Sequence, residues 1–137
     1  MNYDIEKITK VLEQHADYFR TGDASKRADL SFADLRNVDL SHAMLSGGDL
    51  TGANLTGADL TGADLSFAEM RNVKLCNADL SDANLTGATL TGADLSDAWL
   101  KNTVLKDTNL TSANLSGAWL NDARLPKYYF LPVNDNG

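Results

Sequence analysis

An apolar residue occupies every fifth position of the chain from Leu30 to Leu125. All 20 of these positions hold leucine except Met70, and a small residue, in 15 cases alanine, stands two positions before each one. Five residues advance an α-helix by about 500°, so a helix would spread these leucines around its whole circumference. In a flat strand, successive leucines would alternate between the two faces. We therefore predict a chain that turns a corner once per five residues and keeps its leucines inside a coil.

The intervening positions carry a second regularity, with Asp or Asn before most leucines and Ser or Thr after them. Units such as 53–57 (ANLTG) and 58–62 (ADLTG) resemble the A(D/N)LXX pattern of the pentapeptide-repeat family. This resemblance implies an all-β solenoid, a right-handed quadrilateral β-helix with four pentapeptides per coil, whose leucines and small residues point inward. The 20 units then form about five coils over residues 26–127, in a tube roughly 24 Å long at a spacing of about 4.8 Å.

The segment before the repeats has helical periodicity over residues 4–20. Its apolar residues fall three or four positions apart: Ile5, Ile8, Val11, Leu12, His15, Tyr18 and Phe19. Asn2 or Asp4 suits the start of this helix, and Gly22 suits the position after its end. We expect residues 1–25 to form a helical cap on the first coil, as solenoids require; a docking helix for a partner is the alternative. We interpret His15 as an ordinary residue of the apolar side.

Residues 20 apart should stack in rows along the tube, one per coil. One outward row holds three aspartates followed by two tryptophans: Asp39, Asp59, Asp79, Trp99 and Trp119. Large aromatic residues on a solvent-facing surface are enriched at protein interfaces. We expect the tryptophans to form a protein contact, and the aspartates to orient the partner electrostatically.

The last ten residues, 128–137, begin with an apolar group that follows the repeats directly: Tyr128, Tyr129, Phe130 and Leu131. Pro126 and Pro132 lack the N–H needed to continue a ladder of hydrogen bonds. This tail is predicted to cap the fifth coil or to mediate dimerisation. Three arrangements are open for Trp99 and Trp119: coverage by the tail, a homodimer through the tail and the tryptophans, or contact with a different protein.

A longer segment occurs twice in similar form, as residues 31–38 (SFADLRNV) and 66–73 (SFAEMRNV), which start 35 positions apart. Because 35 is not a multiple of 20, the copies should lie on different sides of the tube and record a duplication. We expect Phe32 and Phe67 to lie at corners and to pack on the aliphatic parts of Arg36 and Arg71.

The composition limits the classes of function that the chain can have. The chain has 137 residues, one cysteine and a net charge of −7, which argues against an internal disulfide and against direct nucleic-acid binding. We find no signal segment and no apolar run that fits a membrane span, so a cytoplasmic protein is expected. The candidate nucleophile and bases, Cys76, His15 and His42, fall in different rows. We therefore expect no catalysis, no cofactor and no metal.

Three classes of non-catalytic function follow. The first is a module for protein–protein interaction, or a purely structural one. The second, implied by the family resemblance, is a DNA mimic that acts on bacterial gyrase or a related topoisomerase. About 24 Å of duplex DNA carries roughly 14 negative charges. Residues 26–125 hold 13 acidic and 8 basic residues, a net charge of −5, which argues against this class. The third is an ice-binding threonine ladder, which Arg71 interrupts in the row Thr51, Arg71, Thr91 and Thr111.

Overall fold

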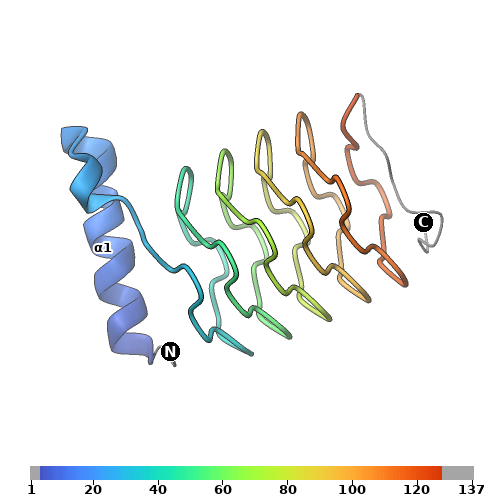
Figure 1. Cartoon of the computed structure of the whole chain (residues 1–137), viewed down its shortest axis with the longest axis horizontal. Helices are drawn as coiled ribbons and strands as arrows, with labels where there is room; N and C mark the ends of the chain where they lie inside the picture. Colours follow the sequence, from blue (N-terminus) through green and yellow to red (C-terminus); the bar gives the residue numbers. More distant parts are fainter. Residues whose placement is uncertain (1–3, 128–137) are drawn as a thin grey trace.

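The computed structural model describes residues 4–127. They form an N-terminal α-helix, α1 (Ile5–Thr21), and a short 3-10 helix, η1 (Ala24–Lys26), followed by a tube of stacked coils that continues to the end of the repeats (Figure 1). The β-structure of the tube consists of isolated single-residue bridges between coils rather than extended strands. Neither helix in the described part of the chain has the length and hydropathy of a transmembrane segment.

Helix α1 lies across the first coil at one end of the tube (Figure 1). The Asp4 side chain accepts a hydrogen bond from the Lys7 N–H at 2.9 Å and caps the helix start. Gly22 ends the helix with a left-handed φ of 74°, and its N–H donates to the Tyr18 carbonyl. Ile8 is buried in the leucine core, so the apolar side of the helix covers the end of the tube.

Within residues 4–127, sixteen parallel bridges join the coils, and each one pairs residues 20 positions apart. They form four rows of five residues, beginning at Asp29, Asp34, Asp39 and Met44. The backbone bonds follow the same register, as where Leu60 N–H donates to the Asp79 carbonyl at 2.7 Å. The predicted 20-residue register is therefore confirmed.

Each pentapeptide ends in a tight corner. The N–H three residues after a leucine donates back to that leucine's carbonyl, as from Ala63 to Leu60 at 3.0 Å. The second residue after the leucine has a positive φ, either as glycine, for example Gly62 at 68°, or as a larger residue, for example Asn77 at 58°. These two features define a type II turn, in which Gly and Asn are favoured because they tolerate positive φ.

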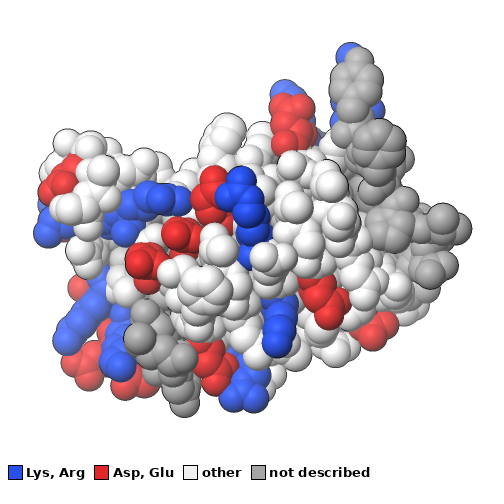
Figure 2. Space-filling view, in the orientation of Figure 1, with Lys and Arg blue, Asp and Glu red and all other residues white. Residues whose placement is uncertain are grey.

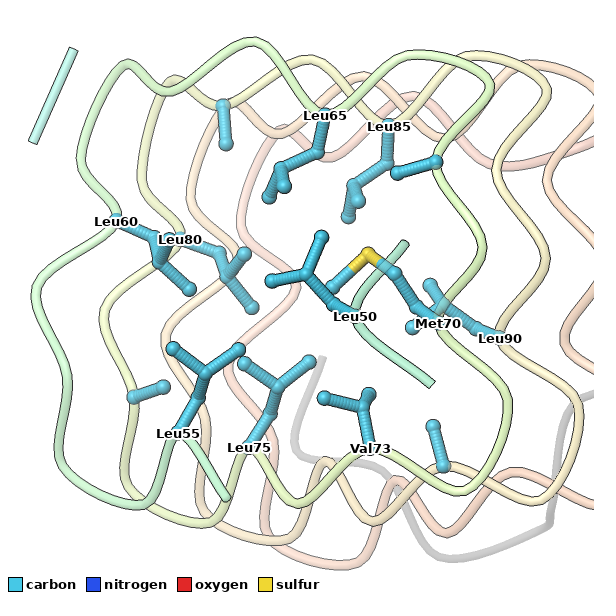
Figure 3. Close-up of a cluster of buried hydrophobic side chains, with 14 of the residues drawn as sticks. Leu50, Leu55, Leu60, Leu65, Met70, Val73, Leu75, Leu80, Leu85 and Leu90 are labelled. Atoms are coloured by element: carbon cyan, nitrogen blue, oxygen red, sulfur yellow. The ribbon is translucent and has the colours of Figure 1, made fainter. Parts of the chain in front are cut away.

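The interior of the tube is filled by leucines that converge from four sides, as Leu55, Leu60 and Leu65 do in Figure 3. Successive members of each row stack along the axis, such as Leu60 and Leu80, and both of these side chains are fully buried. The small residue two positions before each leucine is also turned inward. Its small volume leaves room for the leucines, and the core is a continuous apolar column.

Two of these inward positions hold threonine instead of alanine. The Oγ1 atoms of Thr103 and Thr108 donate to the carbonyls of Leu80 and Leu85, both at 2.7 Å. Each hydroxyl therefore has a partner within the coil that precedes it. Among the described residues, no buried side-chain nitrogen or oxygen lacks a hydrogen-bond partner.

Candidate interaction face

The position before each leucine has a local structural task. Asp59 Oδ1 accepts from the Thr61 N–H at 2.9 Å, and Asn84 Oδ1 accepts from the Thr86 N–H at 3.0 Å. The same bond recurs at many other repeats, where it fixes the N–H of the first residue after the leucine, at the start of the corner. A short side chain with a carbonyl or carboxylate oxygen is needed for this bond, which accounts for the Asp/Asn preference at this position.

Trp99 and Trp119 occupy this position without being able to make the bond, because the indole ring has only a donor. Their rings stack on each other with centroids 5.4 Å apart and planes 12° apart, and their backbones form a bridge. The side chains are 49% and 41% exposed. The 20-residue register therefore places both tryptophans on one side of the tube, where they form a paired aromatic surface.

The same row continues toward α1 as three aspartates, bridged in sequence from Asp39 to Asp59 to Asp79, and Asp79 is bridged to Trp99. Each carboxylate uses Oδ1 to accept from the N–H two residues on, at 2.9 Å. The side-chain and backbone hydrogen bonds from Ser41 lower the pKa of Asp39. We call the five residues of this row the aromatic–acidic row; its Asp39–Asp79 part has a structural role that its Trp99–Trp119 part lacks.

The other aromatic predictions have different outcomes. Tyr128, Tyr129, Phe130 and Leu131 lie outside the described residues. Phe32 and Phe67 do lie at corners, with φ of 58° and 57°, and their packing on Arg36 and Arg71 stays a prediction. Each ring also lies against the glycine of the next coil, where a Cβ placed on Gly52 or Gly87 would come within 2.6 Å of ring carbons.

The guanidinium groups of Arg36 and Arg71 are each held by a nearby carboxylate. Arg36 donates to the Asp34 carboxylate at 2.7 and 2.8 Å, and Arg71 donates to Glu69 at 2.6 Å. Each ion pair joins the residue before a core position, Leu35 or Met70, to the residue after it. The phenylalanine rings meet the next coil at Gly52 and Gly87.

His15 is more than the ordinary apolar-side residue predicted from the sequence. It is fully buried, its Nδ1 accepts from the Ala28 N–H at 2.8 Å, and its other ring nitrogen, Nε2, lies 2.8 Å from the Ser46 carbonyl. Because a backbone N–H can only donate, Nδ1 carries no proton and Nε2 donates. Burial lowers the pKa of His15; the bond to Ser46 partly opposes this, and the charge of Arg27 adds to the lowering. Its place in the apolar stripe was the only sequence signal, and it gives no hint of these bonds.

The remaining candidate catalytic groups are not brought together. Cys76 donates through Sγ to Asp94 Oδ2 at 3.0 Å, and burial, reinforced by that carboxylate, raises the pKa of the thiol. A raised pKa disfavours the nucleophilic thiolate. His42 lies at an exposed corner against Gly62. Within residues 4–127, no group of three or more His, Cys, Asp or Glu side chains is arranged to hold a metal ion.

Comparison with known proteins agrees with this architecture. The family profile described as Pentapeptide repeats matches eight copies, over residues 26–62, 58–97 and 90–125. The chain therefore belongs to the pentapeptide-repeat family. A search of curated proteins found no match.

Several solved structures are similar to the chain. A pentapeptide repeat protein from the thylakoid lumen of Arabidopsis thaliana is 31% identical over 69% of each chain, with a TM-score of 0.54. HetL, a pentapeptide repeat protein involved in heterocyst differentiation regulation in Nostoc sp. strain PCC 7120, is 35% identical over 77% of this chain and 60% of HetL, with a TM-score of 0.41. Rfr23 from Cyanothece 51142 is 25% identical over 88% of this chain and 97% of Rfr23, with a TM-score of 0.44. Since one of these proteins is from a thylakoid lumen, a cytoplasmic location stays a prediction.

Proposed function

We propose that the protein is a non-catalytic interaction module that presents the aromatic–acidic row to another protein. Its scaffold, on the family resemblance, is a right-handed quadrilateral β-helix with a helical cap. The observation that carries the proposal is the exposed stack of Trp99 and Trp119, at positions where the repeat otherwise favours Asp or Asn. Tryptophan is among the residues that contribute most to binding free energy at protein interfaces.

The rigidity of the row supports this role. The Trp99 N–H donates to the Ala78 carbonyl at 2.9 Å, and the Trp119 N–H donates to the Ala98 carbonyl at 2.9 Å. The backbone under both rings is thus fixed on the preceding coil, and the rings restrict each other by stacking. A surface ordered before binding loses little conformational entropy on association.

The charges in the row favour a partner with a basic surface. Asp39 and Asp59 are exposed and Asp79 is half-buried, and the turn bond of each uses Oδ1. Rim carboxylates of this kind accelerate association with a positively charged partner and contribute less to affinity. The tryptophans would then supply most of the affinity and the aspartates the orientation.

The charge pattern supports an interaction surface over a DNA mimic. Basic side chains lie among the acidic ones on the face shown in Figure 2, and the net charge of the repeats, −5, is below the roughly 14 negative charges on DNA of the same length. A gyrase supercoiling assay tests the alternative. Inhibition that weakens when Asp39, Asp59 and Asp79 are replaced by asparagine would favour the mimic.

The interaction is tested by capturing proteins from the native host with three baits. These are the wild type, the double variant Trp99→Asn/Trp119→Asn, and the control Phe67→Asn. Asparagine can restore the turn bond at the tryptophan positions, and it already occupies a positive-φ corner at Asn77, so all three baits should fold. We expect a partner that is retained by the wild type and the control and lost by the double variant. Recovery of the same proteins by all three baits would refute the proposed face.

Self-association is measured separately by analytical ultracentrifugation of the wild type and the double variant. A wild-type dimer that dissociates in the double variant would make the second copy the partner. A monomer in both cases would leave a different protein as the partner and exclude the homodimer through the tryptophans.

A further inference from the structure

Helix α1 is held on the first coil by few contacts. Ile8 and His15 are its buried residues, Val11 and Leu12 are half-buried, and Phe19 is 51% exposed. The two hydrogen bonds of His15 join the middle of the helix to the segment at Ala28 and to the coil at Ser46. Most of the stability of a helix in a protein comes from the packing of its apolar face, so α1 depends on its docking contacts.

The bond that His15 accepts from the Ala28 N–H requires a neutral ring, whereas Nε2 can donate to Ser46 in either protonation state. Protonation would place a hydrogen on Nδ1, directly opposite the Ala28 N–H at 2.8 Å, so that two donors would face each other. The imidazolium would also be buried without a counter-charge, which is costly. Docking and protonation of His15 therefore oppose each other.

The surroundings of the ring reinforce this opposition. Tyr18 stacks on it with centroids 5.3 Å apart, and Phe19 meets it edge-on at 5.0 Å, both from α1. Arg27, in the segment after η1, is the charged group that acts on it, and Ser46 faces it from the first coil. No described carboxylate forms an ion pair or a hydrogen bond with the ring, and the positive charge of Arg27 disfavours a second cation beside it.

We propose that His15 makes α1 a pH-sensitive cap, which is docked on the first coil while the ring is neutral and is released when the ring is protonated. The released state has an ordinary histidine pKa of about 6.5, whereas the docked state has a lowered one. The released state therefore binds more protons below that pH. The docking constant keeps its full value above about pH 6.5, and it falls by up to about tenfold per pH unit below this until the docked-state pKa is reached.

Amide hydrogen exchange followed by NMR on the full chain tests the proposal. Protection factors, corrected for the intrinsic pH dependence of exchange, are measured between pH 7.5 and 4.5. We expect protection of the α1 amides and of the Ala28 amide to fall by up to about tenfold per pH unit below 6.5, while amides of the central coils, such as Leu60 and Leu80, keep theirs. Parallel behaviour of α1 and the central coils over this range would overturn the proposal.

Two variants identify the titrating group. In His15→Gln, the side-chain amide can accept from Ala28 and donate toward Ser46 without titrating, so the pH dependence of α1 protection should disappear. In His42→Asn, which alters the exposed histidine and keeps a residue suited to positive φ, the pH dependence should persist. A pH response that survives in His15→Gln, or that is lost in His42→Asn, would contradict the assignment to His15.

Discussion

The pairing of Phe32 with Gly52 gives a quantitative test of how the coils fit together. A Cβ added at Gly52 would lie 2.5 Å from two carbons of the Phe32 ring, and the backbone there has a φ of +68°. The substitution Gly52→Ala therefore introduces both backbone strain and a steric conflict with the coil before it.

Each contribution has a known scale. A left-handed conformation costs a non-glycine residue about 1–2 kcal/mol, and displacing the Phe32 ring from its rotamer costs about 0.5–1.5 kcal/mol. Alanine also lowers the conformational entropy of the unfolded chain, which offsets about 0.4–1 kcal/mol of this destabilisation. We expect Gly52→Ala to lower the free energy of unfolding by about 2 kcal/mol, measured by urea denaturation with tryptophan fluorescence, with no change in the dependence on urea.

A double-mutant cycle separates the two contributions. Phe32→Ser removes the ring and keeps a residue type that already adopts positive φ in the same row, at Ser112, where φ is 60°. In that background, Gly52→Ala should cost about 1 kcal/mol less, because only the backbone strain is left. If the two costs agree within about 0.3 kcal/mol, the limit of additivity for uncoupled sites, the Phe32 ring does not rest on Gly52 and the stacking argument fails.

Two further predictions concern the core and the surface carboxylates. Leu80→Asp should abolish cooperative unfolding in the same urea assay, because it places an unpaired charge in a fully buried position. A urea unfolding curve like that of the wild type would refute the inward orientation of the leucines. The hydrogen bond from Arg36 lowers the pKa of Asp34 to about 2, so this carboxyl should titrate near that value in carbon-13 NMR, with its contribution to stability present above its unfolded-state pKa and lost as the pH falls toward 2. In Arg36→Gln the pKa of Asp34 should return toward 3.8, and an unchanged value would show that Arg36 is not the cause.

The leucine spacing predicted one turn per five residues, because only a chain that turns once per repeat keeps every fifth residue inside. The number of repeats per coil, four, was implied by the family resemblance, and the two together predicted the register of the rows. For the same reason the sequence placed Trp99 above Asp79 and beside Trp119. The side-chain angles that stack the two indole rings are decided by local packing and were not accessible from spacing.

Two features depended on contacts that the repeat pattern does not encode. The bonds of His15 join residues 13 and 31 positions away, across the junction between helix and tube, where the five-residue periodicity has not yet begun. The contact between the Phe32 ring and Gly52 joins residues 20 positions apart and depends on the side-chain angle of Phe32. At a positive-φ corner the nearest surface belongs to the residue 20 positions on.

The glycines opposite Phe32 and Phe67 have a consequence for how such a protein lengthens. The two phenylalanines are 35 residues apart, and so are their glycines, Gly52 and Gly87. The second pair therefore repeats the first on a different edge of the tube, with both halves of the steric match present. Insertion of any whole number of pentapeptides keeps the leucines inside the tube, whereas a phenylalanine at such a corner also needs room for its ring at the residue 20 positions on. The length of such a tube is therefore constrained at its corners as well as in its core.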